Sequence, residues 1–171
     1  MAGDIEDPRR HEPEFGLAER DMLEEWLDFQ RVTLLLKCEG LSDEQRKRRS
    51  VATSLLSLHG LVRHMAEVEH GWFVRVLSDS ADEPYHFASD AEDSELVPLD
   101  HADWASDLET WQAACERSRV IAAGHSLDDT GPHRMGPCTL RWIYVHMIEE
   151  YARHNGHADL LRELLDGAVG Y

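Results

Sequence analysis

Apolar residues recur at intervals of three, four and seven positions along four separate stretches of the chain. One face of an α-helix has this spacing, whereas a half-buried strand alternates apolar and polar residues. No stretch alternates convincingly, although the loop around 126–137 has room for a short strand. The pattern predicts four helices, over residues 16–38, 53–78, 100–123 and 139–167.

Helix-breaking and capping residues separate these four stretches. An acidic segment with two prolines, residues 79–99, lies between the second and third helices and predicts a long crossover loop. Asp100, in the sequence DHAD, is the predicted N-cap of the third helix, and Gly167 is the predicted stop of the fourth. Four helices of about 20 to 28 residues predict an all-α fold, a four-helix bundle with a long crossover between helices 2 and 3.

The length of 171 residues is enough for one domain with a hydrophobic core. Residues 1–15 are polar and proline-containing, which predicts a flexible N-terminal arm, and residues 16–171 then form the single bundle domain. The start of the chain lacks the apolar segment of a signal peptide, and no stretch approaches the ~18 apolar residues of a membrane span. Three cysteines without a CxxC motif are typical of a reducing cytoplasm, where we expect the protein.

The formal net charge is -17, from 34 acidic and 17 basic residues. Nucleic acids and anionic membranes are both bound through a basic surface. The one basic cluster, RKRRS at 46–50, is too short to reverse this balance. We therefore expect neither nucleic acid nor membrane as a partner.

The fourth helix carries an unusual group of side chains within its apolar stripe, in the sequence HMIEEYARHNGHADLL at 146–161. At about 100° per residue, His146, Glu150, His154 and His157 fall within about 80° of one another. The same arc holds the apolar residues Ile143, Met147, Leu161 and Leu164. The opposite face holds Arg141, Asn155, Asp159 and Glu163.

A glutamate on a buried face needs a partner, because an ionised carboxylate without one costs several kcal/mol. Glu150 lies four residues before His154 and four after His146, so it can share one cation with either. A third ligand must come from another helix. His64 lies on the apolar stripe of the second helix, whereas His59 and His70 fall off that stripe.

A site with three histidine and glutamate ligands leaves coordination positions open, which is typical of catalytic metals. Imidazole and carboxylate ligands suit zinc, nickel or iron without choosing among them. We expect a divalent metal, with zinc as the first candidate.

The sequences HMIEEYARHNGHADLLRE and SLLSLHGLVRHMAEVEHGWF resemble the DinB-like superfamily over residues 16–167. More narrowly, they resemble its actinobacterial branch, first described as a domain of unknown function and called the mini-circle proteins. Typical DinB proteins carry the motif H-x3-H-x3-H-R-G-Q in the last helix. The resemblance implies a four-helix bundle that often dimerises, so a homodimer is expected.

The resemblance also implies the ligand set, which is His64, Glu150 and His154. Glu150 stands where most members have histidine, as in the similar mycothiol-dependent maleylpyruvate isomerases, and it changes the charge of the metal centre by one unit. His157 replaces the usual glutamine and is a candidate further ligand, proton shuttle or packing residue. His146 and His157 are the candidate catalytic residues.

Several members of the superfamily act as thiol S-transferases or isomerases with mycothiol, bacillithiol or glutathione. The resemblance implies a metal that holds the low-molecular-weight thiol as a thiolate, with mycothiol as the favoured cosubstrate and a small electrophile as its partner. One alternative is a non-catalytic metal-binding bundle that acts as a stress-linked sensor or sequestration protein. A ferritin-like di-metal site is disfavoured, because only Glu67 and His70 match its Glu-x-x-His motif.

Overall fold

The computed structural model describes residues 7–86, 96 and 99–169. Its helices are α1 (Glu19–Cys38), α2 (Asp43–Lys47), α3 (Leu58–Glu69), the π-helix η1 (His70–Leu77), α4 (Trp104–Ala123) and α5 (Leu140–Asp166). Its strands are β1 (Thr130–Gly131) and β2 (Cys138–Thr139). Helix η1 continues α3 directly, so the described residues form four long helices. The predicted all-α bundle is confirmed.

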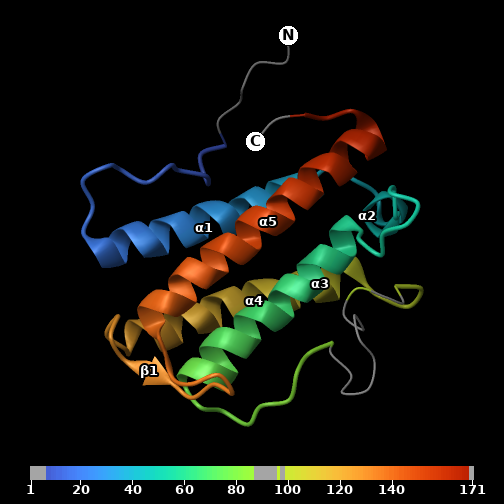
Figure 1. Cartoon of the computed structure of the whole chain (residues 1–171). Helices are drawn as coiled ribbons and strands as arrows, with labels where there is room; N and C mark the ends of the chain where they lie inside the picture. The colour runs from blue at the N-terminus through green and yellow to red at the C-terminus, as the bar shows by residue number, and fades with distance from the viewer. Residues whose placement is uncertain (1–6, 87–95, 97–98, 170–171) are drawn as a thin grey trace.

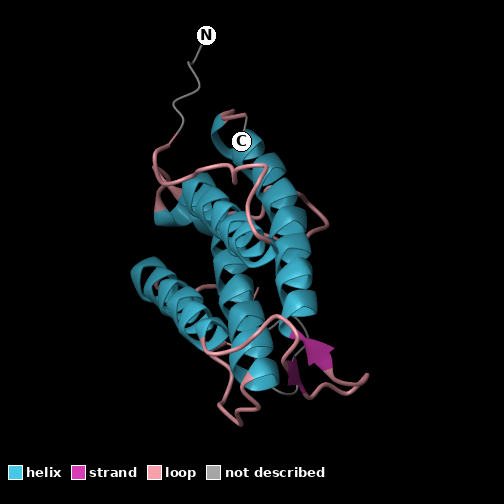
Figure 2. Ribbon diagram, turned by 90° about the vertical axis from the view of Figure 1, so that its left-hand side faces the viewer, coloured by secondary structure: helices cyan, strands magenta, loops and turns pink. Residues whose placement is uncertain are grey.

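The four long helices lie side by side, as Figures 1 and 2 show. Helix α5 packs mainly along α1, and α3 packs along α4. Helix α3 also contacts α5, so these two helices face each other across one side of the bundle. The hairpin of β1 and β2 lies at the end of the bundle where η1 ends and α5 begins.

The hydrophobic core lies between the helices, because each long helix turns one apolar face inward. Its members include Leu23, Leu27 and Leu34 of α1, Leu61, Met65 and Phe73 of α3 and η1, Trp111 of α4, and Ile143, Met147, Tyr151 and Leu161 of α5. Leu164, predicted on the same arc, is exposed.

Three helices begin later than predicted. Helix α1 begins at Glu19 instead of residue 16, and for the other two the caps explain the difference. Helix α3 begins at Leu58 instead of residue 53, because the Oγ of Ser57 accepts a hydrogen bond from the backbone N–H of Gly60 at 3.1 Å. Helix α4 begins at Trp104, because Asp103 and not Asp100 is the N-cap. Both aspartates are acceptable caps by type, so their sequence alone does not choose between them.

The connection between the first two long helices contains a helix that was not predicted, α2. Ser42 and Gln45 form its capping box, in which the Ser42 hydroxyl accepts from the Gln45 N–H and the Gln45 side chain accepts from the Ser42 N–H. Helix α5, in contrast, ends as predicted. It is followed by Gly167, whose φ of 77° is the left-handed conformation that glycine adopts readily.

The hairpin approaches η1 most closely at Gly131. A Cβ at this position would lie 2.6 Å from the carbonyl carbon of Val76 and 2.8 Å from the Cα of Leu77. Both atoms belong to the backbone of a packed helix and have little freedom to move. Only glycine therefore fits at residue 131, and this contact fixes the hairpin against the end of the bundle.

Replacing Gly131 with alanine is expected to destabilise the fold by about 1–3 kcal/mol, the usual cost of overpacking. Chemical denaturation measures this change in the free energy of unfolding. Gly156→Ala is the matched control, because nothing lies within 4 Å of a Cβ there and alanine favours the helix. Equal stability of the Gly131→Ala variant and the natural chain would contradict the close approach.

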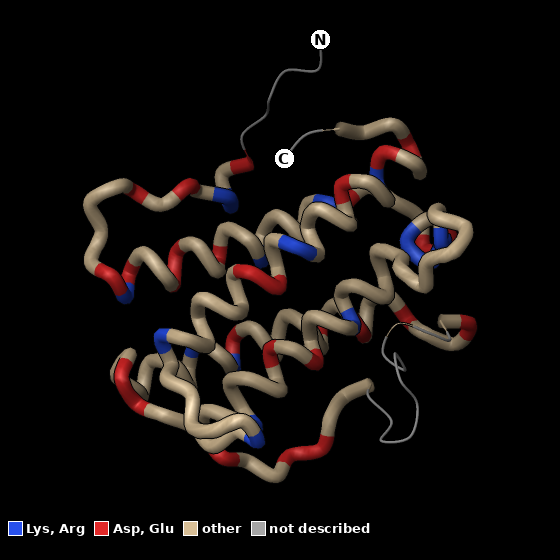
Figure 3. Tube along the Cα trace, viewed as in Figure 1, with Lys and Arg blue, Asp and Glu red and all other residues tan. Residues whose placement is uncertain are grey.

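Among the described residues, no helix is both long and apolar enough to cross a membrane. Asp and Glu positions recur along the chain in Figure 3, with Lys and Arg positions interspersed singly or in small groups. Part of the crossover loop, residues 87–95 and 97–98, lies outside the described residues. The segment from 79 to 86 contains no helix or strand, as predicted.

Candidate metal centre

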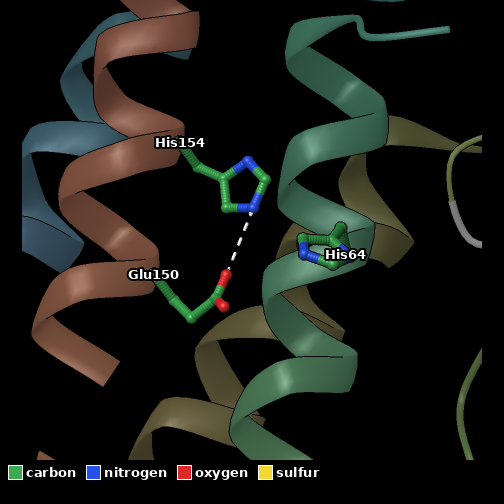
Figure 4. Close-up of side chains that lie close together, drawn as sticks. All are labelled: His64, Glu150 and His154. Carbon is green, nitrogen blue, oxygen red and sulfur yellow. Dashed lines mark ion pairs between the residues drawn. The ribbon is translucent and has the colours of Figure 1, made fainter. Parts of the chain in front are cut away.

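Three side chains predicted as metal ligands converge between α3 and α5. Glu150 and His154 project from adjacent turns of α5 toward His64 of α3 (Figure 4). The Nε2 of His154 lies 3.4 Å from the Oε2 of Glu150, and the rings of His64 and His154 are 4.7 Å apart between centroids. One potential ligand atom from each residue lies within 4.8 Å of the other two. The structure thus brings together residues that are 86 and 4 positions apart in the sequence.

The cluster lies at the margin of the core and not in its centre. The side chains of Glu150 and His154 are 15% and 12% exposed. Three helix-wheel assignments are wrong. His59 and His70, predicted off the apolar stripe, are buried, and so is Asn155, predicted on the polar face. Because α5 contacts both α1 and α3, its buried arc is wider than one apolar stripe. Asn155 faces α1, where its Nδ2 donates to the carbonyl oxygen of Gln30 at 3.0 Å.

Burial, with the neighbouring His64 and His157, lowers the pKa of His154 to about 4. The imidazole of His154 is therefore neutral at pH 7 and has a lone pair to offer. Two imidazoles and one carboxylate form a donor set that suits zinc and similar divalent cations, with coordination positions left for a substrate. The residues present fit the metal that the family resemblance implies.

The two candidate catalytic histidines lie on either side of this cluster. The Nδ1 of His157 is 3.4 Å from the Nδ1 of His154, on the side of that ring away from Glu150. The Nε2 of His146 is 3.7 Å from the Oε1 of Glu150. Both are half-buried.

Aromatic rings hold His146 in place. Its ring stacks on Trp142 at 4.9 Å with an interplanar angle of 15°, and the ring of Trp72 lies 4.7 Å away, edge to face. His133, from the loop between the two strands, packs against Trp72 with the ring centroids 5.3 Å apart. Sequence analysis gave none of these contacts, because they join η1, the hairpin loop and α5.

A second group of potential ligand atoms shares Glu150. His146, Glu149 and Glu150 each offer one atom within 4.8 Å of the others. Arg153 pairs with Glu149 and lies 3.6 Å from the Oε1 of Glu150, so its guanidinium already supplies positive charge there. The group around His64 and His154 draws its ligands from two helices, does not include Glu149 and is less exposed, so it is the better candidate.

Glu67 and His70, the one match to a ferritin-like motif, do not converge. The Glu67 carboxylate accepts a hydrogen bond from the backbone N–H of His86, and the ring of His70 packs on Tyr85 at 4.6 Å. Neither belongs to a group of three potential metal ligands in the described part of the chain. The geometry gives no support to a di-metal carboxylate centre here.

The cysteines are all free thiols with pKa values above the ordinary range. Burial raises the pKa of Cys38 to about 12, and it raises the pKa of Cys115 and Cys138 as well. At neutral pH these thiols are protonated and poorly nucleophilic. None of the three thiols is therefore favoured as a nucleophile.

A buried polar network lies next to the histidine–glutamate cluster along α5, and sequence analysis missed it. Glu69 of α3 is fully buried and accepts two hydrogen bonds of 2.7 Å from Arg31 of α1. It accepts a third from the hydroxyl of Tyr151 of α5 at 2.9 Å, and Trp111 of α4 donates to that same hydroxyl. The sequence did contain a signal for the burial of Glu69 alone, because this residue lies seven positions after the buried Val62.

Burial by itself would raise the pKa of Glu69, but Arg31 and the hydrogen bonds hold it below the ordinary value. Burial also raises the pKa of the Tyr151 hydroxyl. Glu69 is thus a carboxylate and Tyr151 a neutral donor at pH 7. The network ties all four long helices together one residue along α5 from Glu150.

His59 and His70 make stability depend on pH. Burial lowers the pKa of both below 6.5, despite the contact of His59 with Asp107 at 2.8 Å. The unfolded chain then binds protons at these residues more readily than the folded chain does. Stability is full above about pH 6.5 and falls as the pH drops from there toward the folded pKa values.

The melting temperature is accordingly expected to fall between about pH 7.5 and about pH 5.5. His70→Gln should reduce this slope, because it removes one group with a depressed pKa. His11→Gln, a change at an exposed position, should leave the slope unchanged. The same slope in His70→Gln and the natural chain would show that His70 does not titrate with folding.

The fold and the histidine–glutamate cluster between α3 and α5 define a helical bundle of the DinB-like class. The model of the family described as mycothiol-S-transferase matches residues 22–167, and the chain belongs to this family. The match spans all four long helices and confirms the family resemblance seen in the sequence. Membership makes the chain a mycothiol-dependent S-transferase, with mycothiol as its thiol cosubstrate. No curated protein and no solved structure matches it.

Proposed function

We propose that the chain joins mycothiol through its sulfur to a small electrophile, with His64, Glu150 and His154 holding a divalent cation. Zinc is the first candidate, and nickel or iron would accept the same donors. The observation that carries this proposal is the convergence of three donors from two helices within 4.8 Å. A cavity of about 220 Å³ that includes His64 and Trp72 in its lining adjoins the cluster, which favours a catalytic centre over a closed binding site.

When bound, such a cation stabilises the thiolate form of mycothiol at neutral pH. Three features of the chain favour binding of the cation and of the thiol. His154 is held neutral, so it need not lose a proton before it binds the metal. Glu150 supplies one negative charge in place of a third imidazole. The margin position of the cluster leaves one side open to a cosubstrate.

His157 is proposed to position His154. A proton on the Nδ1 of His154, donated to the Nδ1 of His157 at 3.4 Å, leaves the Nε2 of His154 free for the metal. His146 is proposed to accept the thiol proton and pass it to solvent, because it borders Glu150 and its side chain is 22% exposed. Trp72 and Trp142 would keep its ring in place for this transfer.

Thiol preference tests the proposed function. The metal-loaded protein is expected to catalyse the reaction of mycothiol with small electrophiles faster than the reaction of glutathione or bacillithiol with the same electrophiles. The loss of free thiol is measured by colorimetric titration, and the conjugate is identified by mass spectrometry. Metal removal with a chelator should stop the reaction, and added zinc should restore it. Turnover that survives complete metal removal would contradict the proposal.

Cytoplasmic location and a homodimer are further proposals. A thiol cosubstrate needs a reducing compartment, which supports the first. Val145, Leu160 and Leu164 expose apolar side chains on α5, which supports the second. Light scattering distinguishes a monomer of 19.6 kDa from a particle of twice that mass.

A further inference from the structure

The cavity beside His64 runs along one face of the continuous helix formed by α3 and η1. Val68 and Trp72 line it on successive turns after His64, and Pro84 closes it from the segment that follows η1. Gly71, also in the lining, leaves space because nothing lies within 4 Å of where its Cβ would be. The result is a largely apolar slot that starts at a proposed metal ligand.

One arginine, Arg75, lines this slot, and its side chain is exposed. Arg75 makes no hydrogen bond or ion pair within the described residues, although it lies in a strongly acidic chain. Most other arginines are paired with carboxylates, among them Arg9, Arg20, Arg31, Arg117, Arg119, Arg141, Arg153 and Arg162. Helical side chains lean toward the preceding turn, which for Arg75 is the turn with Gly71.

The carboxylate of Glu67 also lines the slot, where a hydrogen bond orients it without neutralising its charge. Glu67 accepts a hydrogen bond from the backbone N–H of His86, whereas Arg75 has no partner in the described structure. An arginine fork binds a carboxylate through two parallel hydrogen bonds. The slot therefore combines an apolar wall with one cation available to an anionic group.

The volume of the slot suits a small cosubstrate. A cavity of about 150 Å³ accepts benzene, and pockets for larger ligands begin near 300 Å³. At about 220 Å³ the slot has room for a small molecule.

We propose that this slot binds the electrophilic cosubstrate, and that Arg75 selects small electrophiles that carry a carboxylate on an apolar body. The inference rests on the proposed function for its chemistry, because the electrophile must approach a thiolate held near His64. Binding of the electrophile in the slot can be tested without turnover. Arg75 is accordingly a specificity residue, with Trp72 and Val68 as the apolar wall.

Binding of benzoate and of its neutral analogue benzamide tests the inference without any reaction. Both are titrated into the zinc-loaded protein while the indole N–H signal of Trp72 is followed by nuclear magnetic resonance. Benzoate is expected to shift this signal and to bind about tenfold or more tightly than benzamide, as a charge-assisted hydrogen bond allows. Arg75→Gln should remove this preference, and Arg75→Lys should keep part of it. Arg49→Ala, a change at an exposed arginine outside the slot, is the control.

Two outcomes would overturn the inference. A benzoate affinity that is unchanged in Arg75→Gln means that the carboxylate binds elsewhere, the metal included, and overturns the inference. Equal affinity for benzoate and benzamide overturns it as well. Failure of the proposed function has a different signature, namely a bound metal with no mycothiol turnover, and leaves the preference for benzoate intact.

Discussion

Replacing His154 with alanine is expected to abolish stoichiometric metal binding and to lower mycothiol transfer at least a hundredfold. The change removes one of three donors that lie within 4.8 Å of one another. Charge stabilisation by a bound metal contributes several kcal/mol to catalysis, and each 1.4 kcal/mol corresponds to a factor of ten. Elemental analysis of untagged protein gives the metal content, and thiol consumption gives the rate.

Two further variants separate ligation from general damage. His157→Gln is expected to weaken metal affinity by about 10–100-fold without abolishing it, as loss of a residue that orients a ligand does. His101→Ala, at an exposed histidine far along the sequence from the cluster, should change neither readout. Full metal content in His154→Ala would remove this residue from the ligand set.

Replacing Glu69 with alanine is expected to cause the largest loss of stability, about 3–5 kcal/mol. The change leaves the guanidinium of Arg31, which is 4% exposed, without its two-bond partner. The contact of Arg31 with Asp28 at 2.7 Å compensates only in part. For a chain of this length the melting temperature should fall by about 6–20 °C. Urea denaturation measures the free energy directly.

The double variant Arg31→Met with Glu69→Leu is the informative control. Replacing both members of a buried ion pair with apolar residues of similar size is often close to neutral, because no charge remains unpaired. The double variant should therefore be more stable than Glu69→Ala. If it is equally unstable, packing and not the ion pair accounts for the loss.

The buried network also links the fold to the candidate site. Glu69 of α3 accepts a hydrogen bond from Tyr151 of α5, and Tyr151 follows Glu150 directly. This bond fixes how α5 is rotated relative to α3, and hence how Glu150 and His154 face His64. Glu69→Gln, which keeps the volume of the side chain, should therefore lower metal affinity even where the fold persists.

Periodicity and capping signals were enough to predict the bundle. The spacing of apolar residues gave four helices, and Gly167 gave the end of α5. Competing caps limited the prediction at the start of α4, where Asp103 binds the N–H of Ser106 although Asp100 is also a suitable residue. Such a choice depends on packing, here of Trp104 on His59 at 5.3 Å.

The candidate site was predicted in part. Spacing along α5 placed Glu150 and His154 together. The apolar stripe of the second helix offered His64, and the family resemblance assigned it as a ligand. The helix wheel could not show that α5 is covered from two sides, so it put Asn155 on the wrong face. The pairing of Arg31 with Glu69 was also out of reach, because 38 residues separate them and only the packed fold brings them together.

Anomalous diffraction from crystals of untagged protein, at the zinc absorption edge and the edges of nickel and iron, is the most direct measurement. The expected result is one strong peak bonded to an imidazole nitrogen of His64, a carboxylate oxygen of Glu150 and the Nε2 of His154. No peak among these three side chains in metal-saturated crystals would contradict the account. A peak bound instead by His146, Glu149 and Glu150 would contradict it equally.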